Sequence, residues 1–530
     1  MRLPAGFALE WRERTQRQAF LHVDVLVEFW LGGVDLLLPD FFVPGPFVPG
    51  HIFLAPTQRV HFIGIGGIGM SGIAEILLTM GYMVSGSDLK SSPVTDRLAQ
   101  LGATIYVGHT ESNATACDVV VASSAVSVAN PEVMEAKRRK TPVIQRAEML
   151  AELMRLKYGI AVAGMHGKTT TTSMIAAVLA GGGLDPTVVV GGRVDALGSN
   201  ARLGTSQYLV AEADESDRSF LKLSPVLAVV TNLDREHMDC YSSMEDVYTA
   251  FVEFMDRLPF YGAAFCCIDN ERLRSILPRV RRKVYTYGES EDADFRLEML
   301  PKRADCHGTF AVHFGGRSLG PFLLHVPGKH NVLNATAAIA VGVQLGIPLE
   351  ELAQGLATFR GVDRRFQVKG NVGGVTVVDD YGHHPTELLA TLRAAKDCGY
   401  RKIHVVFQPH RYTRTHDLMA EFAGAFGDAD TVEVLDIYAA SEEPIAGVTG
   451  QALAGAASAV AGPSKQIEYA ASVAEAVERL VAVAEPGDVV MTLGAGSVSG
   501  IAPVLVEALR AKTKIKTDPH SFTDLHERFA

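Results

Sequence analysis

The sequence predicts an α/β protein with about three domains, the first of them a doubly wound sheet. Short apolar strands alternate with amphipathic helices from Arg59 onward, which is typical of parallel sheets covered by helices on both faces. Two predicted strands run into glycine-rich turns that open helices, at residues 64–69 and 164–167. The 530 residues suffice for about three domains, and the hydrophobic share of 48% is ample for their cores.

The first domain begins with a strand, a glycine turn and an amphipathic helix in RVHFIGIGGIGMSGIAEILLTMG, and further strands are expected in YMVSGSD, ATIYVG and DVVVASSAV. Gly64 to Gly69 fits the pattern G-x-G-x-x-G, and Asp88 ends the next strand, as in dinucleotide sites. The same loop can hold any diphosphate, including that of a nucleotide sugar. It can also be a tight packing turn without a ligand, so the pattern alone leaves these alternatives open.

The second domain opens with the strand and turn IAVAGMHGKTTTT, residues 160–172. Small residues let backbone N–H groups point at an anion, and the helix N-terminus favours negative charge. Lys168 supplies a cation for the outer phosphates of ATP, and the hydroxyl of Thr169 can hold Mg²⁺. The glycine spacing is two residues shorter than in the common G-x-x-x-x-G-K-[ST] loop, so a plain strand-to-helix turn is the alternative.

Polar residues follow the next strands of this domain. Glu212 and Asp214 end SQYLVAEAD, and Asn232 and His237 lie in TNLDREHMD. The carboxyl ends of strands in an open α/β sheet converge on the crevice that binds ligands, and an acid there can complete a Mg²⁺ shell. Taken singly, Glu212 could be an exposed loop acid and His237 a structural histidine.

A third α/β set follows residues 360–365, with strands expected in GVTVVDDYGHHP, IHVVFQP, DTVEVLDIY and GDVVMTLGAGS. DDYGHHPTE and FQPHRYTRT place acids, histidines and arginines after two of these strands, and arginine suits carboxylate and phosphate groups. A solvated polar loop is the alternative for each segment. Asn331 and Asn334, at a helix start, could bond an adenine edge or cap the helix.

Composition narrows the class of protein. The net charge of −11 and pI near 5.9 argue against a nucleic-acid partner. No uncharged apolar run reaches the roughly 18 residues of a membrane helix, so membrane insertion is not expected. Six cysteines without a C-x-x-C pair favour a reduced, cytoplasmic protein.

The first 56 residues differ from the rest, because they mix apolar runs with charges and Pro-Gly breaks and have no clear period. They hold both tryptophans, Trp11 and Trp30. We expect an appendage of unknown role, either a dispensable extension or a translated segment upstream of the true start, with docking on the first domain as the competing view. Residues 513–530 form a polar tail.

Together these segments resemble the Mur ligases of peptidoglycan synthesis from about Thr57 to about Lys512. The resemblance rests on an ordered series of motifs: IGIGGIGMSGIAEIL, GMHGKTTTT, AEADESDRSFLKLSP, TNLDREHMD, LPFYG, VPGKHNVLNATAA, RRF, VDDYGHHPTE, FQPHRYTRT and GAGSVS. It implies a Rossmann-like UDP-sugar domain (57–156), a central P-loop ATPase domain (157–362) and a Rossmann-like amino-acid-binding domain (363–512).

The implied activity is ATP-dependent ligation of L-alanine to the lactyl carboxylate of UDP-N-acetylmuramate through an acyl phosphate, with Mg²⁺ as cofactor. A homodimer is left open. By matching positions, the resemblance implies catalytic roles for Lys168, His237, Arg365 and His384, and metal ligands at Thr169, Glu212 and His237. It implies ATP contacts at Gly164, Met165, His166, Gly167, Lys168, Thr169, Thr170, Asn331, Asn334 and Asp380, and substrate contacts at Gly66, Ser85, Asp88, Ser123, Arg411 and Arg414.

Three positions depart from or fall short of the family pattern. Met165 stands where the family usually has threonine, at a position expected to act mainly through its backbone, and Glu236 stands where the family tends to have aspartate. Lys222 is near the place of a carboxylated lysine in sister ligases, but its spacing to Asn232 differs, so it is given no such role.

Three other functions compete with this reading. A murein peptide ligase, which joins a recycled tripeptide to the same sugar nucleotide, is the nearest. The compact ESDRSFLKLSP and the full FQPHRYTRT argue against it. An NAD-dependent oxidoreductase would leave GMHGKTTTT unexplained, and a UDP-sugar sensor without activity could keep the fold.

Overall fold

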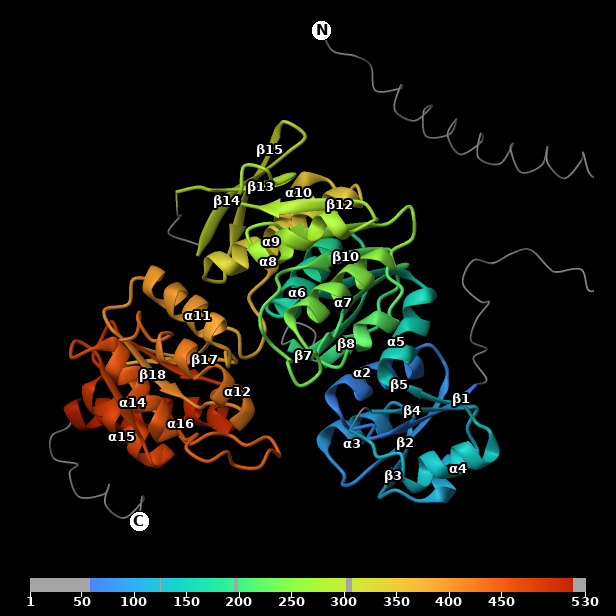
Figure 1. The fold of residues 1–530 in the computed structure, drawn as a ribbon, viewed down its shortest axis with the longest axis horizontal. Coiled ribbons are helices and arrows are strands. Elements are labelled where there is room, and N and C mark those ends of the chain that lie inside the picture. Colours follow the sequence, from blue (N-terminus) through green and yellow to red (C-terminus); the bar gives the residue numbers. More distant parts are fainter. Residues whose placement is uncertain (1–57, 124, 195–198, 302–306, 518–530) are drawn as a thin grey trace, which may run out of the picture. The chain divides into compact units, whose positions relative to one another are not determined.

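The computed structural model describes residues 58–123, 125–194, 199–301 and 307–517. The chain divides into two units, Met1–Ile52 and Phe53–Ala530, and all described residues belong to the second. The predicted appendage and most of the predicted tail therefore lie outside the described residues. The second unit contains three separate sheets, one for each α/β set of the sequence (Figure 1).

The first sheet is parallel throughout, in the order β3-β2-β1-β4-β5. Val60 and Phe62 of β1 share a core with Ile73 and Leu77 of the first helix, whereas Ile63 packs with residues of α4 on the other face. Helices therefore cover both faces, as the alternation predicts. The elements are β1 (Arg59–Ile63), α2 (Ile68–Thr79), β2 (Met83–Asp88), α3 (Pro93–Gln100), β3 (Thr104–Val107), β4 (Val119–Ala122), α4 (Pro131–Arg139), β5 (Val143–Gln145) and α5 (Arg146–Arg155).

The second sheet has ten strands in the order β15-β14-β13-β12-β11-β10-β6-β9-β7-β8, parallel from β13 to β7 and antiparallel at both edges. The strand before the predicted phosphate loop, β6, lies inside it between β9 and β10. The strands are β6 (Tyr158–Ala163), β7 (Thr187–Val194), β8 (Ser199–Arg202), β9 (Tyr208–Glu212), β10 (Leu227–Val230), β11 (Ala263–Cys267), β12 (Val284–Gly288), β13 (Phe295–Met299), β14 (Gly308–Phe314) and β15 (Arg317–Leu324).

Helices pack against this sheet and against each other. The central pair is α6 with α10, which approach closely because both carry glycine at the contact: a Cβ on Gly181 would lie 2.5 Å from the Cα of Gly355. The helices are α6 (Lys168–Gly181), α7 (Met244–Asp256), α8 (Glu271–Ile276), α9 (Lys329–Gln344) and α10 (Leu349–Thr358).

The third sheet runs β16-β17-β21-β18-β19-β20, with only β16 antiparallel to its neighbour. Its two faces have separate cores, one with Leu388 and Leu392 of α11 and one with Leu505 and Leu509 of α16. The elements are β16 (Gln367–Val372), β17 (Val375–Asp380), α11 (Pro385–Asp397), β18 (Ile403–Phe407), α12 (Tyr412–Asp417), α13 (Met419–Ala423), β19 (Thr431–Val434), α14 (Gly450–Ala461), β20 (Gln466–Tyr469), α15 (Val473–Val483), β21 (Val489–Leu493) and α16 (Ile501–Thr517).

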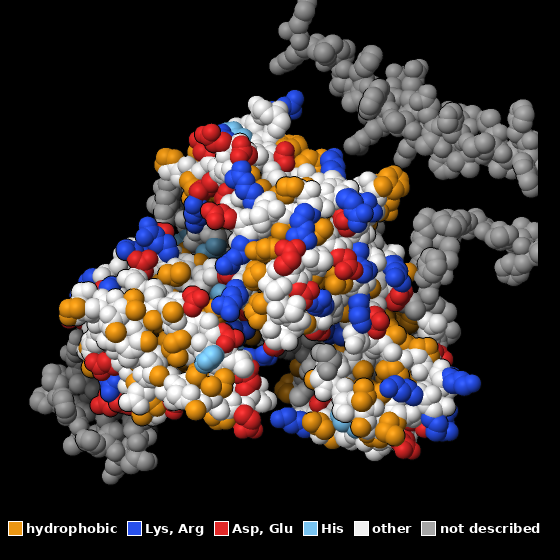
Figure 2. Space-filling view, viewed as in Figure 1, with side chains coloured by type: hydrophobic (Ala, Val, Ile, Leu, Met, Phe, Trp, Pro, Cys, Tyr) orange, Lys and Arg blue, Asp and Glu red, His pale blue; other side chains and the backbone are white. Residues whose placement is uncertain are grey.

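The fold class is confirmed, since all three sheets are mainly parallel with helices between the strands. Two details differ from the sequence prediction. The antiparallel edge strands of the second sheet were not anticipated, and α16 extends to Thr517, beyond the expected domain end at residue 512. Among the described residues, no helix combines the length and apolar character needed to cross a membrane. On the face in Figure 2, basic and acidic side chains are interspersed.

Candidate active site

The loop between β6 and α6 is held by the end of the neighbouring strand β10. Gly164 has φ +124°, and a Cβ there would lie 2.1 Å from the hydroxyl of Thr231, so only glycine fits. The side chain of Asn232 accepts from the backbone N–H of His166 at 2.9 Å and donates to its carbonyl at 2.9 Å. Both backbone groups of His166 are therefore held by Asn232, two residues before helix α6 begins at Lys168.

Lys168 folds back over this loop. Its Nζ donates to the carbonyls of Gly164 at 2.8 Å and Met165 at 3.2 Å, and to Glu215 Oε1 at 2.6 Å. Burial alone would lower the pKa of Lys168, but the carboxylate of Glu215 outweighs it and raises the pKa. The lysine is therefore a charged donor at neutral pH. Met165 is buried and contacts Lys168 through its backbone carbonyl, so its side chain takes no part in this contact.

The carboxylate that contacts Lys168 is Glu215, three residues beyond the predicted Glu212. Glu215 is fully buried, and its Oε2 has no hydrogen-bond partner among the described residues. Nε2 of His237 lies 3.5 Å from Glu215 Oε1, and His237 holds a left-handed backbone with φ 57°. An orphaned buried carboxylate oxygen beside a histidine fits a divalent cation, with Thr169 at the start of α6 and Glu212 at the end of β9 as further oxygen donors.

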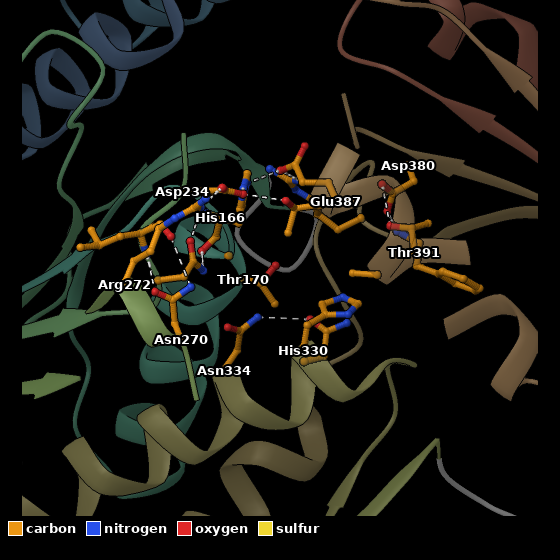
Figure 3. A pocket seen from close by; sticks show the side chains of 18 residues that line it. His166, Thr170, Asp234, Asn270, Arg272, His330, Asn334, Asp380, Glu387 and Thr391 are labelled. Carbon is orange, nitrogen blue, oxygen red and sulfur yellow. Dashed lines mark hydrogen bonds and ion pairs between the residues drawn. The ribbon is translucent and has the colours of Figure 1, made fainter. Parts of the chain in front are cut away.

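A cavity of about 350 Å³ opens beside the loop, at the carboxyl ends of β6, β10 and β11 (Figure 3). Its lining residues come from two domains, the one that contains the second sheet and the one that contains the third. The predicted residues His166, Gly167, Thr170, Asn331, Asn334, Arg365 and Asp380 all line it, together with Asn232, Leu233, Asp234, Asn270, Arg272, His330, Phe366, Thr386, Glu387, Ala390 and Thr391. Lys168, Thr169 and Glu212 are not among its lining residues.

Asn331 and Asn334 lie in the first two turns of α9, where both are buried and line the cavity. Neither caps helix α9, whose N-cap is Gly328 without a side-chain cap, so the capping alternative is wrong. Asn331 donates to the carbonyl of Pro327 at 2.6 Å, and the side chain of Asn334 packs against Gly167, where a Cβ would lie 3.0 Å from its Oδ1. The amide of Asn334 also donates to the side-chain oxygen of Asn331 at 3.4 Å, so the two side chains are linked at the cavity wall.

Arg365 and Asp380 come to the cavity from the third domain. Burial raises the pKa of Asp380, whose oxygens accept from the backbone N–H of Phe366 at 2.7 Å and of Gly382 at 2.8 Å. Arg365 lies 3.5 Å from Glu387 and over the ring of Tyr381. Arg365 thus presents a cation to the cavity while Asp380 fixes the strand end behind it.

His166 connects the two domains. Its Nε2 lies 3.1 Å from Asp234 and its Nδ1 3.4 Å from Glu387, and Figure 3 shows the ring between these carboxylates. Burial alone would lower the pKa of His166, but the two carboxylates raise it to about 10. The hydroxyl of Thr386 donates to Asp234 at 2.6 Å. His384, the N-cap of α11, lies against the ring of His166 at 4.9 Å between centroids.

Arg411 and Arg414 line a second cavity of about 220 Å³, together with Glu236 and His237. Arg414 donates to Glu236 at 3.0 Å. Burial would raise the pKa of Glu236, but His166, His237 and the other surrounding cations lower it to about 2. Glu236, at the position where an aspartate was expected, therefore joins the second domain to the third. Arg411 is more exposed and lies 3.6 Å from Asp239.

In the first domain, the glycine turn is tied to the end of β2. Asp88 accepts from the backbone N–H of Gly66 at 2.9 Å and of Leu89 at 2.8 Å. Ser123 follows β4, which pairs with β1 in parallel, so the three strand ends share one edge of the sheet. Ser85 lies earlier in β2, with its hydroxyl 2.9 Å from His61 Nδ1.

Several cavity residues were not singled out from the sequence. Asp234 and Glu387 lie inside the quoted motifs TNLDREHMD and DDYGHHPTE, but nothing in either motif distinguishes them from the neighbouring acids. Asn270 and Arg272 follow strand β11 and line the cavity. The criterion used for the other strands, polar residues directly after the strand, would also have identified these two. Lys222 lies 3.4 Å from Glu148 of α5 and also donates to the side chain of Gln145.

Comparison with known proteins gives a consistent result along the chain. The domain models described as "Mur ligase family, catalytic domain", "Mur ligase middle domain" and "Mur ligase, glutamate ligase domain" match residues 59–158, 162–342 and 364–496 in turn.

Curated relatives cover most of the chain. The UDP-N-acetylmuramate–L-alanine ligase of Acidobacterium capsulatum is 65% identical over 458 residues, which are 86% of this chain and 99% of the relative. The protein of the same name from Koribacter versatilis is 64% identical over 463 residues, 86% and 98% of the two chains.

Solved structures agree. The UDP-N-acetylmuramate-alanine ligase of Thermotoga maritima has a TM-score of 0.69 and 30% identity, covering 86% of this chain and all of that one. A murein peptide ligase from Psychrobacter arcticus has a TM-score of 0.61 and 25% identity, covering 86% and 99%.

Proposed function

This chain belongs to the Mur ligase family, and from that premise we propose that it joins L-alanine to the lactyl carboxylate of UDP-N-acetylmuramate at the expense of ATP. The products are UDP-N-acetylmuramoyl-L-alanine, ADP and phosphate, and the reaction serves peptidoglycan synthesis. The observation that carries the proposal is the identity of 65% over 86% of the chain to a relative that bears this name.

The site geometry supports the ATP half of the reaction. A carboxylate is a poor electrophile, so transfer of the γ-phosphoryl group of ATP to it, giving an acyl phosphate, is required before an amine can attack. Lys168 is charged and held at the mouth of the loop by Glu215, where it can turn to the phosphates. Positioning and charge stabilisation of this kind supply most of the catalysis in phosphoryl transfer.

Magnesium is the cofactor we propose, and the residues fit it. Glu215, with its orphaned oxygen, would hold it together with Thr169, Glu212 and His237. When bound, the ion neutralises charge on the phosphate oxygens and the approaching carboxylate. Arg365 adds a cation from the third domain, and the buried Asn331 and Asn334 would bond the adenine edge.

The remaining predicted residues are assigned to the two other substrates. Gly66 and Asp88, joined at the edge of the first sheet, would hold the UDP-sugar with Ser85 and Ser123. His384, Arg411 and Arg414 would face the carboxylates of the amino acid and sugar. Contacts between His166, Asp234 and the third domain would keep water from the acyl phosphate once the site closes.

The decisive test is ATP hydrolysis or ADP release measured with each substrate omitted in turn. Turnover that requires both UDP-N-acetylmuramate and L-alanine, with formation of the amide, supports the proposal. The murein peptide ligase is the second candidate, because its solved structure also covers 86% of the chain. A preference for L-alanyl-γ-D-glutamyl-diaminopimelate over free L-alanine in direct competition would favour it instead.

We also propose domain limits at 57–156, 157–362 and 363–517, the last moved from 512 to the end of α16, together with a cytoplasmic location and a homodimer. The location is supported by the use of ATP and by the six cysteines, which form no C-x-x-C pair in the sequence. Sedimentation velocity at several concentrations tests the dimer, and expression of each segment alone tests the limits.

A further inference from the structure

Three side chains from separate elements meet where the second domain contacts the third. His166 comes from the phosphate loop after β6, Asp234 from the loop after β10, and His384 from the N-cap of α11. Nε2 of His166 lies 3.1 Å and Nδ1 of His384 lies 3.6 Å from the same oxygen, Oδ2 of Asp234. One ligand atom from each residue lies within 4.8 Å of the others.

These separations are those of metal ligands. Zinc binds imidazole nitrogen and carboxylate oxygen at roughly 2.0–2.2 Å, so two ligands of a tetrahedral ion lie about 3.3 Å apart. The two measured separations to Asp234 fall on either side of that value. The Nε2 atom of His384 is buried and has no hydrogen-bond partner among the described residues, and the ring has only a long contact of 3.4 Å to the backbone of Thr386. Small side-chain rotations would therefore bring all three ligand atoms to bonding distance of one ion, without breaking other strong bonds of His384.

The groups behind these ligands have the arrangement that metal sites use. Metal-bound histidines usually donate their second ring nitrogen to a carboxylate, and Nδ1 of His166 lies 3.4 Å from Glu387. The other oxygen of Asp234, Oδ1, accepts from the backbone N–H of Arg235 at 2.8 Å and from Arg272. The carboxylate is thus oriented with Oδ2 toward both rings.

We propose that His166, Asp234 and His384 bind a transition-metal ion of the Zn²⁺ class, with water as the fourth ligand. Two nitrogens and one oxygen suit Zn²⁺ or Co²⁺ rather than Mg²⁺, which prefers six oxygens. Binding requires neutral imidazole rings, so any proton on His166 leaves to solvent as the ion enters. The site is separate from the proposed magnesium ligands and does not depend on the proposed function.

The consequence is a link between domains. Two ligands belong to the ATP-binding domain and one to the third domain, so the ion would hold them together. His166 and Asp234 also line the 350 Å³ cavity. The ion would therefore hold the nucleotide loop and the third domain in one fixed arrangement beside this cavity.

The test is cobalt binding to the full chain, stripped of metal by EDTA and without nucleotide. Co²⁺ in a four-coordinate site gives intense visible absorption, and displacement by Zn²⁺ gives the zinc affinity. We expect one such site per chain. His384→Ala should weaken binding at least about 100-fold, because even the carboxylates behind metal-bound histidines are worth roughly 10–100-fold. Glu387→Gln should cost roughly 10–100-fold by the same reasoning.

Two further variants locate the site. His384→Cys keeps a ligand, so it should still bind Co²⁺ and should add a thiolate-to-cobalt charge-transfer band. His410→Ala removes a partly buried histidine of the same domain that stacks on Tyr438, and should leave the affinity within about twofold. Weak, six-coordinate cobalt spectra, or equal affinity in His384→Ala and the unaltered chain, would overturn the proposal. So would a His384→Cys protein that folds but shows no thiolate band.

Discussion

At the scale of single residues, the phosphate loop binds the side chain of its own lysine. Lys168 is bonded to two loop carbonyls and to Glu215, so the binding of ATP phosphates has to replace these contacts rather than order a free side chain. A long flexible side chain loses up to about 2 kcal/mol of rotamer entropy when it is fixed. Part of that loss has already occurred before the nucleotide arrives.

Replacement of Lys168 should affect the reaction with ATP without affecting the binding of the UDP-sugar. Lys168→Ala should lower the ligation rate by ~10²-fold or more, the usual effect of removing one electrostatic donor, and should leave UDP-sugar binding nearly unchanged. Steady-state turnover and calorimetric titration measure the two effects. Lys222→Ala, which removes a lysine paired with Glu148, is the matched control and should keep its rate. Turnover of Lys168→Ala within a few-fold of the unaltered enzyme would contradict the assignment.

A histidine in the cavity gives a pH dependence. Burial, and then the charge of Arg365, lower the pKa of His330 to about 4. The unfolded chain binds a proton near pH 6.5, so the stability that depends on neutral His330 is complete above that pH and is lost as pH falls toward 4. The melting temperature should therefore fall between pH 6.5 and 5.

The same pH series on His330→Asn isolates this effect. The variant should show a shallower decline, by at most one proton, or about 1.4 kcal/mol per pH unit. His416→Asn changes an exposed histidine beside Asp417 and should follow the unaltered chain. Identical slopes for His330→Asn and the unaltered chain would show that His330 does not remain neutral.

Polar residues after the predicted strands indicated where the site lies, but they did not predict which side chains contact each other there. AEADESD offers four acids, and the turn after β9, not the sequence pattern, decides that Glu215 rather than Glu212 contacts Lys168. Glu387 contacts His166 from a separate domain, 221 residues later in the chain. No local period encodes such a pairing, since it depends on how two finished domains meet.

At the scale of elements, the helix pair α6 and α10 depends on two glycines. A Cβ on Gly355 would lie 2.6 Å from the carbonyl oxygen of Ala177, so Gly355→Ala should force the helices apart and cost roughly 1–3 kcal/mol. Gly455 in α14 is the control, because nothing lies within 4 Å of its Cβ position. There alanine should stabilise the helix by about 1 kcal/mol. Urea denaturation measures both, and a Gly355→Ala midpoint at or above the original would refute the close contact.

Elements with a strong local signal were predicted, and those that rely on partners were not. The strand-turn-helix units at residues 59–79 and 158–181 carry buried strands, glycine turns and helix starts in sequence. Strand β13 instead mixes the core residues Phe295 and Leu297 with Arg296 and Glu298. It pairs with the antiparallel strand β14, and its half-buried alternation is too short to define the element without that neighbour.

At the scale of the whole molecule, the matched family domains begin at residue 59. We therefore expect a chain that starts at Thr57 to keep its melting temperature and its alanine-dependent ATPase activity. Both tryptophans, Trp11 and Trp30, precede that point, so tryptophan emission in the full chain reports on the first segment alone. An insoluble or inactive shortened chain, or strongly blue-shifted emission that resists quenching, would show that the segment is part of the fold.

The contacts between the second and third domains also order events during protein synthesis. Thr386 emerges from the ribosome 152 residues after its partner Asp234, which at 5–20 residues per second is about 8–30 s later. During that interval the ATP-binding domain can fold with Asp234 and Glu236 still in water, where a charged carboxylate needs no partner. The partners of Asp234 and Glu236 from the third domain are therefore made in the last third of the chain. A nascent protein cut short before them would have the nucleotide loop without these contacts.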